Sequence, residues 1–111
     1  MATATFIHNG DTIDFTPGTN VAAGDVVVQN DLVGVAKRDI PTGTLGSLAV
    51  VGVFDVPKAA GAGTAIASGA KVYWNATAQQ ATTTASGNKY LGKTVKATVD
   101  ADATVRVRLE Q

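Results

Sequence analysis

The sequence is divided into short stretches in which apolar and polar residues alternate, separated by glycine, asparagine, aspartate and proline. In residues 104–109, three apolar side chains (Val105, Val107 and Leu109) alternate with Arg106 and Arg108 after an initial threonine. A period of two places successive side chains on opposite faces of a strand, and β-branched residues favour that conformation. No stretch has the period of an amphipathic helix. The chain is therefore predicted to be all-β, with little or no helix.

Two turn signals predict hairpins near the N-terminus. Asn9-Gly10 is a favoured dipeptide for a two-residue turn and would pair Phe6 with Ile13. A second turn at Asn30-Asp31 would pair residues 26–28 with residues 33–35, which places the valines of both strands on one apolar face. We expect each hairpin to bury one face and expose the other.

The central run, residues 48–56, has almost no polar alternation. Strands with this pattern are usually covered on both faces. We expect one strand here, covered by the core on one side and by a neighbouring subunit on the other. Val51, Val53 and Phe54 are therefore candidate interface residues.

Further strands are predicted at residues 71–74 and 95–99, with a turn at residues 86–88. Strands recurring about every 8–12 residues indicate a small β-barrel or sandwich built of hairpins. The length of 111 residues suits one β-clip-like domain over residues 1–111, with residues 1–5 as an N-terminal arm. Much of the 45% hydrophobic content is alanine and valine, so oligomerisation would help such a core.

Composition argues against several classes of function. Nine basic and nine acidic residues cancel, which disfavours binding to nucleic acid or an anionic membrane. The absence of cysteine and the single histidine leave no thiolate nucleophile and no metal-ligand cluster, and no cofactor is expected. No apolar run approaches the roughly 20 residues that span a bilayer, and the N-terminal residues lack the pattern of a signal peptide. The chain is expected to be soluble and unprocessed.

One motif points to nucleotide binding. Residues 87–94 contain Gly87, Gly92, Lys93 and Thr94 in the spacing of a phosphate-binding loop. That loop requires a buried strand before it and a helix after it. Residues 80–86 are polar, and residues 94–99 alternate and are β-branched, so neither flank fits. We interpret the match as chance; an ATPase would require saturable ATP binding that Lys93→Ala abolishes.

Two other groups of residues are candidates for protein contacts. Arg106, Arg108, Lys93 and Lys96 would form a basic stripe if their strands are neighbours, suited to an acidic partner or simply to solvent. Tyr73 and Trp74 point to opposite faces of one strand, so one of them belongs to the core and the other is free for an interface. The pattern leaves open which one, and Trp74 is retained as an interface candidate.

The order and spacing of several segments resemble the tailed-phage capsid cement, or head decoration, proteins. The segments cover nearly the whole chain: residues 6–15, 23–28, 32–36, 52–58, 67–74, 92–93 and 102–109. Some members of that family carry the label of recombinase-like ATPases, which the match at residues 87–94 explains.

The resemblance implies a non-enzymatic structural protein, commonly trimeric, made in the bacterial host cytoplasm. It implies binding to the outside of the expanded capsid, with the major capsid protein as partner, and no catalytic residue. An interaction module elsewhere in the virion, such as a head-fibre base or a tail component, is the alternative. An ATPase is the third possibility.

Overall fold

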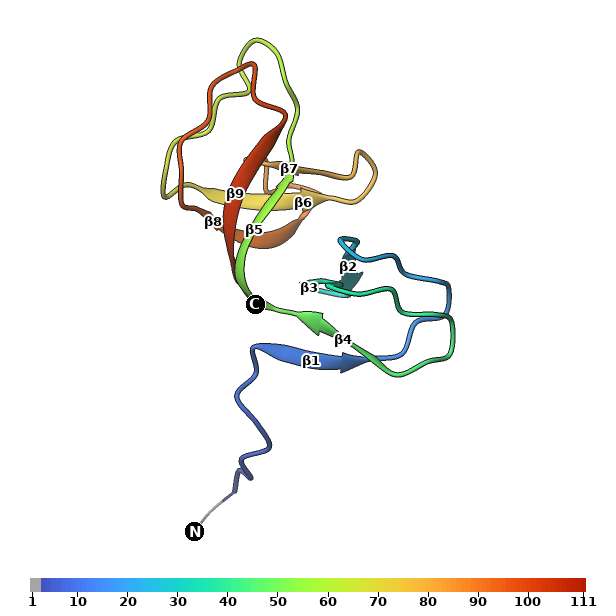
Figure 1. The fold of residues 1–111 in the computed structure, drawn as a ribbon. Coiled ribbons are helices and arrows are strands. Elements are labelled where there is room, and N and C mark those ends of the chain that lie inside the picture. The colour runs from blue at the N-terminus through green and yellow to red at the C-terminus, as the bar shows by residue number, and fades with distance from the viewer. Residues whose placement is uncertain (1–2) are drawn as a thin grey trace.

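The computed structural model describes residues 3–111, which form nine strands in two antiparallel sheets and contain no helix (Figure 1). One sheet has the order β1-β4-β3-β2 and comprises β1 (Thr12–Phe15), β2 (Val26–Gln29), β3 (Leu32–Val35) and β4 (Gly46–Ala49). The other has the order β5-β9-β8-β6-β7 and comprises β5 (Val51–Pro57), β6 (Lys71–Asn75), β7 (Gln80–Thr82), β8 (Lys89–Thr94) and β9 (Thr104–Glu110). The all-β prediction is confirmed. Within the described residues there is no helix long and apolar enough to cross a membrane.

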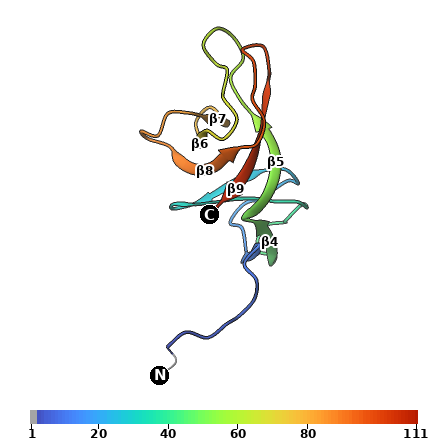
Figure 2. The ribbon, with the colours of Figure 1, turned by 90° about the vertical axis from the view of Figure 1, so that its left-hand side faces the viewer.

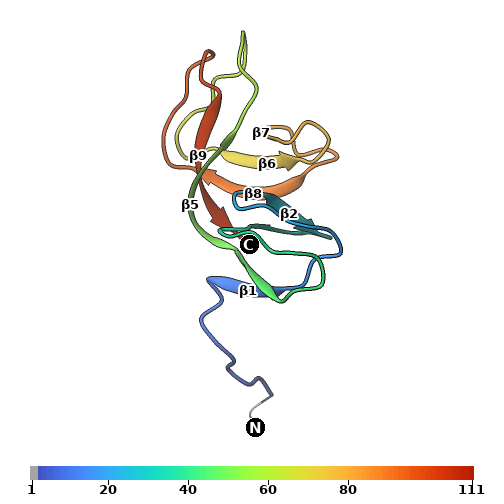
Figure 3. The same ribbon diagram turned by 45° about the vertical axis from the view of Figure 1, so that its right-hand side comes forward.

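The main core lies between the β2–β3 hairpin and the inner face of the five-stranded sheet (Figure 3). Val33 and Val35 of β3 pack there with buried residues of the other sheet, including Leu91 and Val107. The five-stranded sheet curls until Lys58, just after β5, forms an isolated bridge with Ala81 of β7, but it does not close into a barrel. Of the two predicted architectures, the sandwich is therefore the correct one.

A smaller cluster covers the other face of the four-stranded sheet. Ala36, Ile40 and Leu48 are buried there, with Ile13 and Phe15 packed against them. Val27 contributes to this cluster, whereas its neighbours Val26 and Val28 contact the main core. Successive side chains of β2 therefore face two different apolar clusters, which explains why the strand has no polar residue before Gln29.

Several predicted strands are confirmed with their register. Val28 lies opposite Val33 and Val26 opposite Val35, joined by a turn in which Asn30 has a positive φ of 53°. Strand β9 buries its three apolar residues and exposes both arginines, as its alternation predicts.

The Asn9-Gly10 hairpin prediction is wrong. Residues 3–10 form no strand, and Asp11 N donates to Asn9 O at 2.6 Å, which closes a tight turn at Gly10. Strand β1 instead pairs with β4, with Ile13 opposite Leu48. Pairing with β4 brings β1 onto an apolar cluster, and that tertiary packing outweighs the local turn preference.

The prediction of one central strand is also wrong, whereas its cover by a neighbouring subunit stays a prediction. The run divides at Val50 into β4 and β5, which belong to different sheets. Gly52, with a φ of 134°, adopts a backbone conformation that favours glycine just after this switch. Val51 and Val53 are exposed within the single chain, while Phe54 and Val56 face the core.

Residues 95–99 do not form the predicted strand. Val95 N still donates to Arg106 O of β9, but the backbone then turns to the loop around Ile66: Thr98 N donates to Ile66 O, and the Thr98 hydroxyl accepts from Ile66 N. Val95 and Val99 are consequently exposed.

Candidate binding surface

The outer face of the five-stranded sheet gathers most of the residues expected to contact a partner. We call it the outer face and define it by β5, β9, β8 and β6 side chains that point away from the core: Val51, Val53, Asp55, Arg106, Arg108, Glu110, Lys93, Tyr90, Lys71 and Tyr73. The register explains the grouping, because Arg108 lies opposite Val53 on one side and Lys93 on the other. Side chains opposite one another across antiparallel strands share a face.

This face has a charge that the whole chain lacks. It carries four basic residues and two acidic ones, a net charge of +2. The whole chain has a net charge of zero, so the remaining residues, which include the buried Lys58, have a net charge of −2 (0 − 2). A separation of this kind orients a protein toward a partner of complementary charge.

Each carboxylate of the outer face is held by neighbouring side chains. Arg106 donates to both oxygens of Asp55, at 2.9 and 3.2 Å, and this hydrogen bonding lowers the pKa of Asp55. The two residues are directly opposite on β9 and β5. Exposed pairs of this kind contribute little to stability, so we regard this pair mainly as a device that orients the guanidinium.

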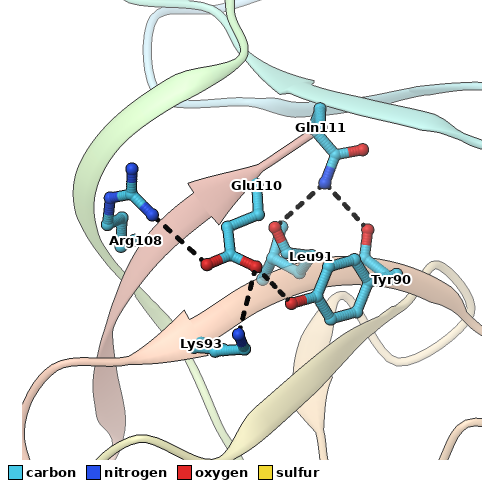
Figure 4. A network of polar contacts seen from close by, with 6 residues as sticks. All are labelled: Tyr90, Leu91, Lys93, Arg108, Glu110 and Gln111. Carbon is cyan, nitrogen blue, oxygen red and sulfur yellow. Dashed lines mark hydrogen bonds and ion pairs between the residues drawn. The ribbon is translucent and has the colours of Figure 1, made fainter.

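Glu110 lies at the centre of a second network (Figure 4). Its carboxylate accepts a hydrogen bond from the Tyr90 hydroxyl at 2.7 Å and from Arg108 at 3.2 Å, and Lys93 Nζ is 3.8 Å away. The Tyr90 hydrogen bond is the main reason that the pKa of Glu110 is lowered. Burial and then the contact with Glu110 raise the pKa of Tyr90 to about 12.

Gln111 ties the end of this network to the other sheet. Its side-chain amide donates to the carbonyls of Tyr90 and Leu91, while its side-chain oxygen accepts from Val33 N of β3 at 2.8 Å. Figure 4 shows the amide reaching back to β8 beside Glu110. One side chain thus satisfies polar groups of both sheets, which fixes the outer face relative to the four-stranded sheet.

The structure separates the predicted interface residues into two groups. Val51, Val53, Arg106 and Arg108 lie together on the outer face. Trp74 is 3% exposed and packs in the main core, so its assignment as an interface candidate is wrong within this chain: its position on β6 turns it inward. Phe54 also points inward and is partly buried. Tyr73, not Trp74, is the aromatic residue on the outer side of β6.

Sequence reasoning missed Lys71, Tyr90 and Glu110 as members of this face. Lys71 could have been found from its position two residues before Tyr73 on an alternating strand. Tyr90 could not, because a register irregularity between Val72 and Tyr73 shifts the pairing of β6 with β8.

The residues of the apparent phosphate-binding loop do not adopt that conformation. Gly87 lies in a turn with a φ of 77°, while Gly92, Lys93 and Thr94 lie within strand β8. The buried Thr94 hydroxyl donates to Ala67 O and accepts from Ala70 N, so it is already used inside the fold. The helix that would orient amides toward phosphate is replaced by residues 95–99, which are neither helix nor strand.

A large hollow lies elsewhere, on the four-stranded sheet. It has a volume of about 760 Å³ and is lined by β1, β4 and the loop 37–41, including Asp14, Lys37, Arg38 and Asp39. In the part of the chain that the structure describes, no group of three or more His, Cys, Asp or Glu residues is arranged to hold a metal. The outer face gathers the predicted interface residues that are exposed, so we take it as the candidate functional surface.

Comparison with known proteins identifies the family of the chain. A model of a protein family described as phage cement protein matches residues 7–109, nearly the whole chain. No curated protein and no solved structure matches the chain significantly.

Proposed function

Because this chain belongs to the phage cement protein family and is thereby a structural, capsid-associated protein of the virion, we propose that it binds the exterior of the expanded capsid and bridges major capsid subunits. The observation that carries the proposal is the outer face, which combines exposed valines with a net positive charge on a hydrogen-bonded sheet. Rigid sheet surfaces lose little conformational entropy on docking.

In this proposal the arginines of β9 contact acidic groups of the capsid, and the neighbouring valines supply apolar area. Arg106 is already oriented by Asp55, so less side-chain freedom is lost when it binds. Binding to the assembled shell but not to its free subunits stabilises the shell by mass action. The protein acts as a homo-oligomer, a trimer, without catalysis or a cofactor.

The test is co-sedimentation of the purified protein with expanded capsids from which the decoration has been stripped. We expect the bound amount to saturate at a fixed ratio to the major capsid protein. The double variant Arg106→Glu/Arg108→Glu should weaken binding by at least about thirtyfold, because loss of even one close charge pair across an interface costs about 2 kcal/mol or more. Lys37→Glu, on the four-stranded sheet, is the control and should bind normally.

Absence of saturable binding would contradict the proposal. Immunogold label on the tail instead of the head would then support another virion module, such as a tail component or a head-fibre base. Equal binding by the double variant and the control would retain the cement role but exclude the outer face as the contact surface.

A further inference from the structure

Strand β5 has an unpaired edge. It is the terminal strand of its sheet, and its only strand partner is β9. Just after its end, Lys58 forms an isolated bridge with Ala81 of β7, so the unpaired part of the edge is residues 51–55. Lys58 N donates to Ala103 O on the β9 side, and hydrogen bonds alternate along an antiparallel ladder. The backbone groups of Val51, Val53 and Asp55 therefore point away from β9. Within residues 3–111 no backbone hydrogen bond joins them to another segment.

Apolar side chains lie on both faces beside the first half of this edge, and the one charged residue of the strand, Asp55, is paired with Arg106. Val51 and Val53 are exposed on the outer face, with Val53 55% exposed, and Phe54 is only partly buried on the inner face. The strand is seven residues long, contains no lysine and has its single proline at the end, Pro57. Long apolar edges without such protection are usually covered by another strand.

The N-terminal segment, residues 3–9, has the complementary properties. It is exposed throughout, and only the Asn9 carbonyl among its backbone groups makes a hydrogen bond, to Asp11 N. Phe6 and Ile7 are 79% and 78% exposed. As neighbours in an extended strand they point to opposite faces, so one can cover Val53 while the other contacts Phe54.

The segment starts beside β5 but runs away from it. Asp11 O accepts a hydrogen bond from Val50 N, at the junction between β4 and β5. The turn at Gly10 then directs residues 3–9 away from the body of the protein, as Figures 1 and 2 both show. The chain therefore leaves its own β5 edge open.

We propose that the N-terminal segment of a second copy of this chain adds to the free edge of β5 as a sixth strand of the sheet. The contact joins two different surfaces, the segment of one copy and the edge of the next. Contacts of this type generate rings when the rotation closes, and three copies would close a trimer. The inference deepens the self-association part of the proposed function: the segment would cover Val53 at the β5 edge and leave the arginines of β9 for the capsid.

Photo-cross-linking tests this contact. The chain has no cysteine, so Val53→Cys introduces a unique thiol that can carry a benzophenone cross-linker. The benzophenone-labelled protein is mixed with unmodified protein that carries a heavy nitrogen isotope, and the cross-linked peptides are identified by mass spectrometry. We expect the label at Val53 to attach to residues 3–9 of the other copy. Val99→Cys, at a valine that is 63% exposed elsewhere, is the control and should not label the segment.

A second measurement is the oligomeric state by sedimentation velocity. Deletion of residues 1–9, or the double variant Phe6→Asp/Ile7→Asp in the full chain, should convert the oligomer to a monomer with an unchanged circular dichroism spectrum. A label on residues 3–9 of the same copy, a label on another surface, or an oligomer that survives both changes would overturn the inference. So would an unmodified protein that is a monomer.

Failure of this contact and failure of the proposed function can be told apart. Oligomers cross-linked through the segment that do not co-sediment with capsids would leave the strand exchange intact and refute the cement role. Capsid binding by a protein whose oligomer does not depend on the segment would refute the strand exchange and leave the cement role intact.

Discussion

Gly92 lies where β8 passes closest to β9, and replacing it with alanine should separate those strands. An added Cβ would overlap the Arg108 carbonyl oxygen and lie 2.9 Å from the carbonyl carbon and 3.1 Å from Leu109 Cα. Ordinary contacts of a Cβ begin at 3.4 Å. All three atoms are backbone, so no side chain can rotate away, and the two strands must move apart in the middle of the five-stranded sheet.

Overpacking of this kind typically costs about 1–3 kcal/mol. With a urea m-value of about 2 kcal/mol per molar, a loss of about 2 kcal/mol lowers the unfolding midpoint by about 1 M. Trp74 is the only tryptophan and is buried, so its fluorescence reports unfolding of the main core. All variants are compared at one protomer concentration, because the stability of an oligomer depends on it.

Two controls make the result specific. Gly18→Ala should change the midpoint little, because an added Cβ there meets no atom within 4 Å. Lys93→Ala removes only an exposed side chain 3.8 Å from Glu110, which costs at most about 1 kcal/mol. If Gly92→Ala unfolds at the midpoint of the unmodified protein, the close approach of β8 and β9 is wrong. If in addition Lys93→Ala abolishes a saturable ATP binding, the phosphate-binding interpretation returns.

Three further predictions concern single side chains. Trp74→Ala should lower the free energy of unfolding by about 3–5 kcal/mol in denaturant titrations, even in a monomeric background; a near-neutral effect would contradict its place in the core. Tyr73→Phe leaves Tyr90 as the only tyrosine, and its phenolate absorbance should titrate at about pH 12, and at a lower pH when Glu110→Gln is added. Because folding raises the pKa of Tyr90, the contribution of Tyr90 to stability should be complete below pH 10 and lost as the pH rises through 12. A titration near pH 10 would contradict the network. Lys58→Met should lower the free energy of unfolding by about 1–3 kcal/mol, measured by thermal unfolding, because the buried ammonium donates to two loop carbonyls at 2.7 and 2.9 Å that would lose their partner. Unchanged stability would show that water replaces the ammonium.

The parts of the fold that follow from local alternation were predictable. The β2–β3 hairpin was predicted with its register, because its turn residues fit the backbone. Strand β9 was predicted with its buried side, because its apolar residues alternate with the two arginines. Residues 95–99 have the same alternation as β9 but form no strand, since their hydrogen bonds beyond Val95 go to a loop whose position the local pattern does not encode.

The outer face was predicted only in part, because it depends on which strands are neighbours. Arg106 and Arg108 were placed on one face by alternation alone, whereas their association with Val53 and Lys93 required the order of strands in the sheet. Alternation predicted that the side chains of Tyr73 and Trp74 point to opposite faces of one strand, but left open which of them faces the core. The side that faces the core is set by where the β2–β3 hairpin packs.

The amino-acid pattern by itself determined that the chain is all-β, that nearly its whole length resembles the phage cement proteins and that residues 87–94 lack the flanking strand and helix of a phosphate-binding loop. These conclusions rest on the period of side chains along a strand and on the residue types that flank a motif, both of which are local. Only the tertiary structure decided that residues 48–56 divide between two sheets, that β1 pairs with β4 instead of residues 3–8, and that the β5 edge stays open. The reason is that contacts between distant segments are selected by the apolar area that they bury together, and that area exists only once the sheets have packed.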